Sequence, residues 1–129
     1  MITPNASDAF LVDSSGWVEY FADGPKASGF AIYLEQEKPV RVPTVVLYEV
    51  FKKLSREHGK TAADRFASQA MRNVIVPLDE MLALSAARVG LYHRLAMADA
   101  IIYATAQAQQ ATLVTGDLHF RDLPGVVIP

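Results

Sequence analysis

Short, continuous apolar runs recur along the chain, and each is separated from the next by a longer stretch of mixed polarity. Runs of this kind are typical of strands that are buried on both faces of a parallel sheet. They predict four strands and a fifth, edge-like strand, over Ala9–Val12, Val40–Val42, Val74–Pro77, Ala111–Thr115 and Val126–Ile128.

The stretches between these runs are predicted to be helical, because residues that favour helix starts precede several of them and Gly59 is a typical stop. Strands that alternate with helices indicate an α/β sandwich with a mostly parallel sheet. The first predicted helix starts at Ser14–Gly16 and is broken by Asp23–Pro25, and the others cover Lys26–Glu37, Thr44–Arg56, Lys60–Arg72, Asp79–His93 and Met97–Gln110.

Composition places the chain among globular proteins, since 51% of its 129 residues are hydrophobic and 20% are charged. No linker or repeat interrupts it, so a single domain over residues 1–129 is expected, with residues 1–8 as a candidate flexible leader. No run is long enough for a membrane span, and the absence of cysteine suits a reducing cytoplasm. A net charge of −2 argues against a general basic coat for nucleic acid but not against a local basic patch.

One carboxylate stands in an otherwise apolar helical stretch, because Asp99 is the only charged residue between Leu95 and Gly116. Burying an isolated carboxylate costs many kcal/mol unless it is paired, capped or bound to a cation. No Lys or Arg lies within reach along the predicted helix. Asp99 is therefore expected either to cap the helix or to meet groups from elsewhere in the fold.

Three further acids stand at informative positions: Asp13 and Asp117 follow predicted strands, and Glu49 lies in the apolar segment VVLYEVF. Each also has a purely structural interpretation. Asp13 could be a helix N-cap, although Ser14 and Ser15 could take that role instead. Asp117 could be a turn residue beside Gly116, and Glu49 could lie on a solvated helix face.

The carboxyl ends of parallel strands meet at one edge of a sheet, where functional sites collect, so these four acids could converge on one pocket. Carboxylates packed together repel one another unless a cation neutralises them. Oxygen ligands without Cys or His favour Mg²⁺ or Mn²⁺, and such a site suits hydrolysis of a phosphodiester.

The segments that carry these acids resemble the PIN-domain family, and more closely its VapC-type toxin ribonucleases of toxin–antitoxin pairs. The matching segments are VDSSGWVEYF (12–21), PTVVLYEVFKKL (43–54), MADAIIYATA (97–106) and TGDLHF (115–120). The resemblance implies a three-layer α/β/α sandwich. It maps the family's acidic quartet onto Asp13, Glu49, Asp99 and Asp117, with Ser14 and Thr115 as supporting polar residues.

The resemblance further implies an endoribonuclease that depends on Mg²⁺ or Mn²⁺, forms a homodimer and is held inactive by a cognate antitoxin. His119 stands two residues after Asp117, where many relatives carry an acid, so a fifth carboxylate is missing there. This difference puts a dense second metal site in doubt. Transfer RNA and ribosomal RNA are the candidate substrates.

Basic residues near these segments are candidates for contacts with RNA phosphates, namely Lys52, Lys53, Arg56, Arg94, Arg121 and His119. A solvated helix face or loop is the alternative for each of them. Tyr48 and Tyr103 flank two of the acids and are expected to pack. The apolar residues of the first two helices, among them Trp17 and Phe30, outnumber what one buried face needs, so these helices are expected to contribute to a partner surface.

Two other classes of protein were weighed against a nuclease. A non-catalytic PIN-like module that binds RNA or protein would have an incomplete acidic quartet, whereas all four acids are present here. A phosphoacceptor receiver domain would need a second acid beside Asp13 and a lysine after a late strand, and both are missing. The sequence therefore favours the nuclease.

Overall fold

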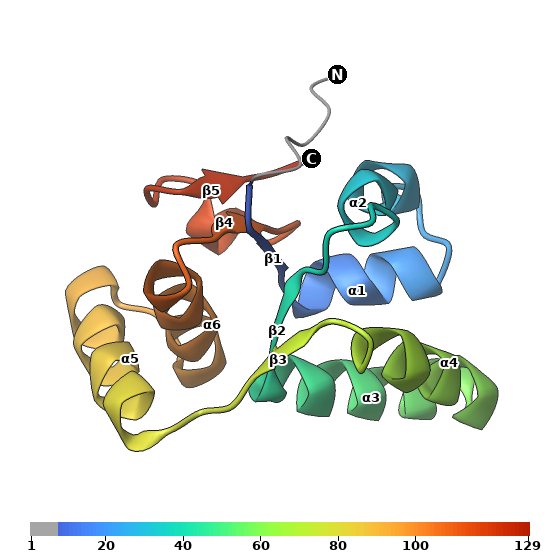
Figure 1. Ribbon diagram of the computed structural model, residues 1–129, viewed down its shortest axis with the longest axis horizontal. Coiled ribbons are helices and arrows are strands. Elements are labelled where there is room, and N and C mark those ends of the chain that lie inside the picture. The colour runs from blue at the N-terminus through green and yellow to red at the C-terminus, as the bar shows by residue number, and fades with distance from the viewer. Residues whose placement is uncertain (1–7) are drawn as a thin grey trace.

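Six helices and a parallel sheet make up the described part of the computed structural model, residues 8–129, and they form three layers (Figure 1). Helices α5 and α6 cover one face of the sheet, and α1 to α4 lie on the other side. The predicted α/β/α architecture is confirmed. The candidate leader lies outside the described residues except for Asp8.

The sheet contains five strands in the order β3-β2-β1-β4-β5, and every neighbouring pair is parallel. Leu11 and Leu113, opposite each other on β1 and β4, are both fully buried, which explains the continuous apolar runs. The strands are β1 (Phe10–Val12), β2 (Arg41–Pro43), β3 (Val74–Val76), β4 (Thr112–Val114) and β5 (Val126–Val127).

All predicted helices are present, and most end one to three residues earlier or later than the patterns indicate. They are α1 (Ser14–Phe21), α2 (Ala27–Leu34), α3 (Thr44–His58), α4 (Lys60–Ala70), α5 (Glu80–His93) and α6 (Met97–Ala108), with a short 3₁₀ helix, η1 (Leu118–Phe120). Arg94 is the C-cap of α5; its backbone is left-handed (φ 57°), and its N–H donates to Gly90 O.

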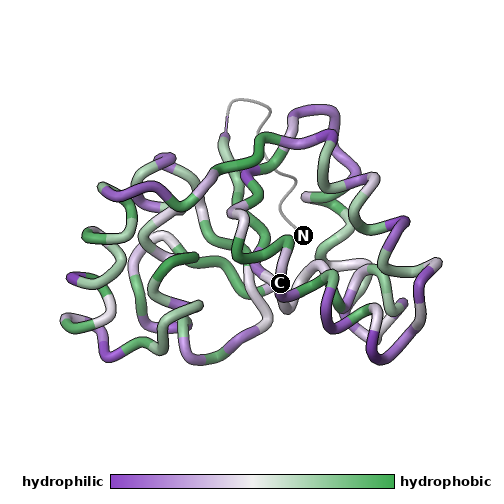
Figure 2. Tube along the Cα trace, turned by 90° about the horizontal axis from the view of Figure 1, so that it is seen from below, coloured by the Kyte–Doolittle hydropathy of each residue, from purple (hydrophilic) through white to green (hydrophobic). Residues whose placement is uncertain are grey.

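The main core combines buried side chains of the sheet with those of helices α1, α2, α3, α4 and α6, and Figure 2 shows hydrophobic segments running through the middle of the molecule. Trp17 of α1 is fully buried and meets the ring of Phe66 of α4 edge-to-face, with 5.3 Å between centroids. Phe30 and Tyr33 of α2 are also buried. Other large apolar residues of these two helices, Tyr20, Phe21, Ile32 and Leu34, are only partly buried, so the expected partner surface there stays a prediction.

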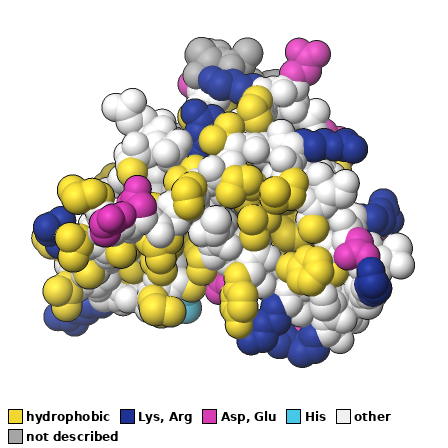
Figure 3. Space-filling model, turned by 60° about the horizontal axis from the view of Figure 1, so that its bottom comes forward, with side chains coloured by type: hydrophobic (Ala, Val, Ile, Leu, Met, Phe, Trp, Pro, Cys, Tyr) yellow, Lys and Arg dark blue, Asp and Glu magenta, His cyan; other side chains and the backbone are white. Residues whose placement is uncertain are grey.

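The exposed large apolar side chains lie on other elements. Figure 3 shows hydrophobic side chains over much of the face that it brings forward, with Lys and Arg side chains at the edges. Helix α5 supplies Met81, Leu84, Leu91 and Tyr92, and Met97 opens α6. A surface of this kind is typical of an interaction site.

Gly16, in the first turn of α1, allows this helix to lie close to β1 and α2. A Cβ atom at Gly16 would stand 2.5 Å from Val12 Cγ1 and 2.7 Å from the ring of Phe30. Both neighbours are buried, so they cannot move without disturbing the core. We expect Gly16→Ala to lower the free energy of unfolding by about 1–3 kcal/mol. Urea unfolding measures this loss, and the exposed Ser28→Ala is the matched control; equal stability of the two variants would contradict the packing argument.

Candidate active site

Asp13 lies where β1 gives way to α1, and its carboxylate connects two strand ends. Oδ1 accepts hydrogen bonds from the Gly16 N–H (3.1 Å) and the Ser15 hydroxyl (2.7 Å), and Oδ2 accepts one from the Thr115 hydroxyl. Asp13 is therefore the N-cap of α1. The alternative in which the serines cap the helix is wrong, because the helix already begins at Ser14 and leaves Asp13 in the capping position.

Burial raises the pKa of Asp13 from 3.8 to about 6. Its hydrogen bonds with Thr115, Ser15 and Gly16 oppose this rise in pKa, and the nearby charge of Asp117 adds to it. Asp13 is only 4% exposed, and the hydrogen bonds that its carboxylate accepts come from neutral groups of Ser15, Gly16 and Thr115. A buried carboxylate in such surroundings favours the approach of a cation.

Thr115 follows β4, and its hydroxyl connects Asp13 to the backbone of Asp117. Its hydroxyl donates to Asp13 and accepts from the Asp117 N–H at 2.9 Å. The Gly116 N–H donates to the Ser15 hydroxyl at 3.0 Å, which adds a second link between the ends of β1 and β4. The predicted supporting position of Thr115 thus agrees with the geometry, and Ser15 is a further linking residue that the sequence patterns did not single out.

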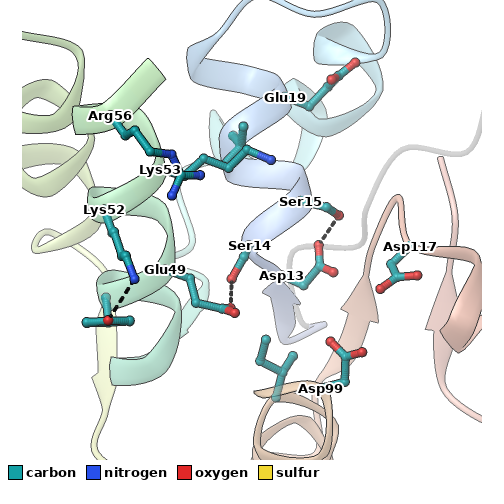
Figure 4. A pocket seen from close by; sticks show the side chains of 13 residues that line it. Asp13, Ser14, Ser15, Glu19, Glu49, Lys52, Lys53, Arg56, Asp99 and Asp117 are labelled. Atoms are coloured by element: carbon teal, nitrogen blue, oxygen red, sulfur yellow. Dashed lines mark hydrogen bonds between the residues drawn. The ribbon is translucent and has the colours of Figure 1, made fainter. Parts of the chain in front are cut away.

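Glu49 approaches the same region from α3. Its Oε1 accepts a hydrogen bond from the Ser14 hydroxyl at 2.6 Å, which joins α1 to α3 across the pocket (Figure 4). The solvated-face interpretation of Glu49 is therefore incomplete, since its carboxylate is directed to Ser14. Ser14 thus contacts one of the four acids, and its role as a supporting polar residue stays a prediction.

Asp99 stands in the first turn of α6, but it does not cap this helix, because the N-cap is Ala96, which makes no side-chain cap bond. The Asp99 pKa is raised, first by burial and then by the charges of Asp117 and Glu49, whereas His119 lowers it. Of the two expectations for this residue, the second is confirmed: Asp99 meets acids that come from elsewhere in the fold.

Three side chains come close enough to share one ion. Ligand atoms of Asp99, Asp117 and His119 all lie within 4.8 Å of one another. His119 Nδ1 is 3.0 Å from Asp117 Oδ1, and the backbone N–H of His119 donates to the same oxygen at 2.9 Å. This donor set fits a divalent cation, because carboxylate oxygens suit Mg²⁺ and Mn²⁺ and an imidazole nitrogen favours a transition metal such as Mn²⁺.

The pocket that contains the acids has a volume of about 570 Å³ (Figure 4). All four predicted acids line it, and so do Ser14 and Ser15. Asp13, Asp99 and Asp117 lie on one side of it, and the basic side chains of α3 lie on the other. These basic residues are Lys52, Lys53 and Arg56.

The other residues that the sequence analysis singled out differ in their distance from this pocket and in their burial. Arg94 and Arg121 lie outside the lining of this pocket, and the Arg121 guanidinium is 3.8 Å from Asp122. Tyr103 is buried and donates its hydroxyl to Pro124 O at 2.7 Å, so its predicted packing role is confirmed. Tyr48 is 63% exposed and lines the pocket, so the expectation that it packs is wrong.

The parallel α/β/α fold, with four acids in one pocket, defines the class of protein to which the chain belongs. The model of the PIN domain matches residues 10–126, and the chain belongs to the PIN-domain family. A comparison with curated protein sequences gives no significant match. None of the helices in the described residues is long and apolar enough to cross a membrane.

Among the solved structures with a similar fold are three from different organisms. A toxin–antitoxin complex from Klebsiella pneumoniae is 22% identical with a TM-score of 0.79, and the match covers 95% of this chain and 98% of that one. The Sarcin–Ricin-loop-cleaving toxin VapC20 of Mycobacterium tuberculosis is 20% identical with a TM-score of 0.78 over 95% and 100% of the two chains. VapBC2 of Rickettsia felis, bound to a DNA fragment from its promoter, is 15% identical with a TM-score of 0.71 over 94% and 97%.

Proposed function

We propose that the chain is a metal-dependent endoribonuclease and the toxin of a toxin–antitoxin pair. The observation that carries this proposal is the convergence of Asp13, Glu49, Asp99 and Asp117, from four separate segments, on one pocket. Membership of the PIN-domain family and the similar folds of toxins support it. A binding module would have no need for four mutually repelling acids at one place.

The chemistry of the acids favours a bound Mg²⁺ or Mn²⁺. Asp99 and Asp117 would hold the ion directly together with His119, and Asp13 and Glu49 would act as further ligands, directly or through water. A divalent ion in this position would activate a water and stabilise the charge that develops on a phosphate. A site with the His119 imidazole in place of another carboxylate fits one firmly held ion better than two.

The remaining polar residues of the pocket orient its acids and hold the substrate. Thr115 and Ser15 fix the Asp13 carboxylate, and Ser14 fixes that of Glu49. Lys52, Lys53 and Arg56 offer positive charge on the side of the pocket opposite the three aspartates, where they would bind RNA phosphates. The scissile phosphate would thus lie between the acids and the basic side chains.

Cleavage of end-labelled total transfer RNA and ribosomal RNA tests the proposed function. We expect discrete fragments with Mg²⁺ or Mn²⁺ and none with EDTA, because the acids alone do not activate a water for attack on a phosphate. Loss of cleavage by at least tenfold in Lys53→Ala would support the proposed phosphate contacts. The matched control is Arg72→Ala, an exposed residue outside the pocket lining. Intact RNA under every condition would favour the binding module instead.

We also propose an antitoxin partner, a homodimer and a cytoplasmic location, as the resemblance implies. One similar structure is a toxin–antitoxin complex, which supports the first of these. The exposed apolar side chains of α5 offer a surface for a protein contact. Co-purification with a small protein encoded beside this chain would support an antitoxin partner, and a monodisperse, highly soluble monomer would count against both protein contacts.

A further inference from the structure

Tyr48 presents an exposed aromatic ring to the pocket. It immediately precedes Glu49 on α3, and its side chain lines the same pocket as the four acids. Lys52, one helical turn later, places its ammonium 5.3 Å from the centroid of the ring and 3.3 Å from the Tyr48 hydroxyl. The ring is therefore held at the pocket by a neighbour and is not buried in the core.

We propose that Tyr48 is a positioning residue that stacks on an unpaired nucleobase of the substrate next to the phosphate that is cut. This inference rests on the proposed nuclease function and adds to it a residue that decides where the RNA strand is held. Stacking of one base on the ring would fix the distance between that nucleotide and the acids on the other side of the pocket.

The arrangement of charges around the ring supports this assignment. Lys52, Lys53 and Arg56 lie along the same face of α3, so the ring stands at one end of a row of cations. Proteins that hold single strands combine such a basic track with aromatic rings, because phosphates bind the cations while bases stack on the rings. Stacking on a ring does not depend on the RNA sequence, since every base has a π-face.

Another exposed aromatic residue provides a contrast. Tyr92 of α5 is 83% exposed, which is more than Tyr48, but it lies outside the lining of this pocket. Exposure alone therefore does not distinguish Tyr48; its position beside the acids and the basic row does. Tyr92 is the matched control for any effect that follows merely from removing a surface ring.

The test measures binding of a fluorescein-labelled, 12-nucleotide single-stranded RNA by anisotropy. All proteins carry Asp99→Asn, so that the RNA stays intact in the presence of Mg²⁺. We expect Tyr48→Ala to weaken binding by roughly 5- to 150-fold, the range for loss of one base–aromatic stack. Tyr48→Phe keeps the ring and is expected to bind within about twofold, and Tyr92→Ala is expected to bind unchanged.

A second RNA of the same length, with abasic sugars in place of its bases, separates stacking from charge. We expect Tyr48→Ala to leave binding of this abasic RNA unchanged, because no base remains to stack. An equal loss with both RNAs, or no loss with either, would overturn the assignment. The wild-type cleavage assay decides the proposed function separately: metal-dependent cleavage together with unchanged binding by Tyr48→Ala removes only the stacking role. Reduced binding of an antitoxin but not of RNA would show that the ring serves a protein partner instead.

Discussion

Replacement of Asp99 by asparagine is expected to reduce RNA cleavage by about a thousandfold while the protein stays folded. Asp99 is one of three groups whose ligand atoms lie within 4.8 Å of one another, so its loss removes a proposed metal ligand. Metal ions supply several kcal/mol of transition-state stabilisation, and each 1.36 kcal/mol corresponds to tenfold in rate. The amide keeps the shape of the carboxylate, so the packing of α6 is preserved.

The same substitution is expected to stabilise the metal-free protein. Burial raises the pKa of Asp99, and the charges of Asp117 and Glu49 raise it further, so the ionised carboxylate is disfavoured and repelled in the folded state. Asparagine relieves this repulsion, and the free energy of unfolding should rise by roughly 0.5–1 kcal/mol, the scale of partly exposed charge pairs.

Cleavage rates and urea unfolding curves, measured in parallel, test both halves of this prediction. Asp122→Asn is the matched control, because the Asp122 side chain is 92% exposed and lies outside the pocket lining. A variant that loses activity because it unfolds would fail the second half. Full activity in Asp99→Asn would remove this residue from the metal site.

Stability of the metal-free protein is expected to fall as the pH rises from about 4 to 7. Asp13 has a pKa of 3.8 in its unperturbed state and of about 6 in the folded protein. Between these values the folded chain binds a proton that the unfolded chain has released, so raising the pH favours unfolding. At 1.36 kcal/mol for each pKa unit, the full loss from Asp13 is about 3 kcal/mol, of which about 2 kcal/mol falls between pH 4.5 and pH 7.5.

Urea unfolding at pH 4.5 and pH 7.5, on protein stripped of metal with EDTA and then dialysed, measures this loss. Asp13→Asn keeps a residue that caps helices well and cannot ionise, so its stability should depend less on pH by the same amount. Addition of Mn²⁺ at pH 7.5 should restore stability to the wild type, because a ligand that binds only the folded state stabilises it. Equal pH dependence in both proteins would show that Asp13 is not the group responsible.

Much of the fold follows from local patterns. The short apolar runs place all five strands, because most positions of a strand in a parallel sheet covered on both faces are buried; the polar exceptions, Arg41 and Thr112, each open a strand and are only partly buried. The exact ends are less predictable: α2 stops at Leu34, whereas the pattern continues to Glu37. Helix ends depend on tertiary contacts that the pattern does not contain.

The site was predictable as a set of acids but not as a geometry. The solitary Asp99 in an apolar segment signals a partner from elsewhere, and the strand-end positions of Asp13 and Asp117 indicate where the acids meet. The part of Ser15, which links Asp13 to Gly116, depends on the adjacency of β1 and β4, which lie far apart in the sequence. No local signal reports such a contact.

Exposure was the property that sequence patterns judged least well. Tyr48 lies among apolar residues and reads as a core position, yet it faces the pocket. The sequence pattern suggested that the first two helices carry more apolar residues than one buried face needs. Two of these residues, Trp17 and Phe30, are nevertheless almost completely buried. The reason is that α1 packs against α2, α3 and α4 as well as against β1, so more than one of its faces is covered.

Calorimetric titration of Mn²⁺ into the purified protein tests most directly whether the converging acids form a metal site. The account predicts one bound ion for each chain, with affinity reduced at least tenfold in Asp99→Asn and in Asp117→Asn and unchanged in Asp122→Asn. Absence of binding, or binding that is equal in all four proteins, would contradict the assignment of a metal centre to this pocket.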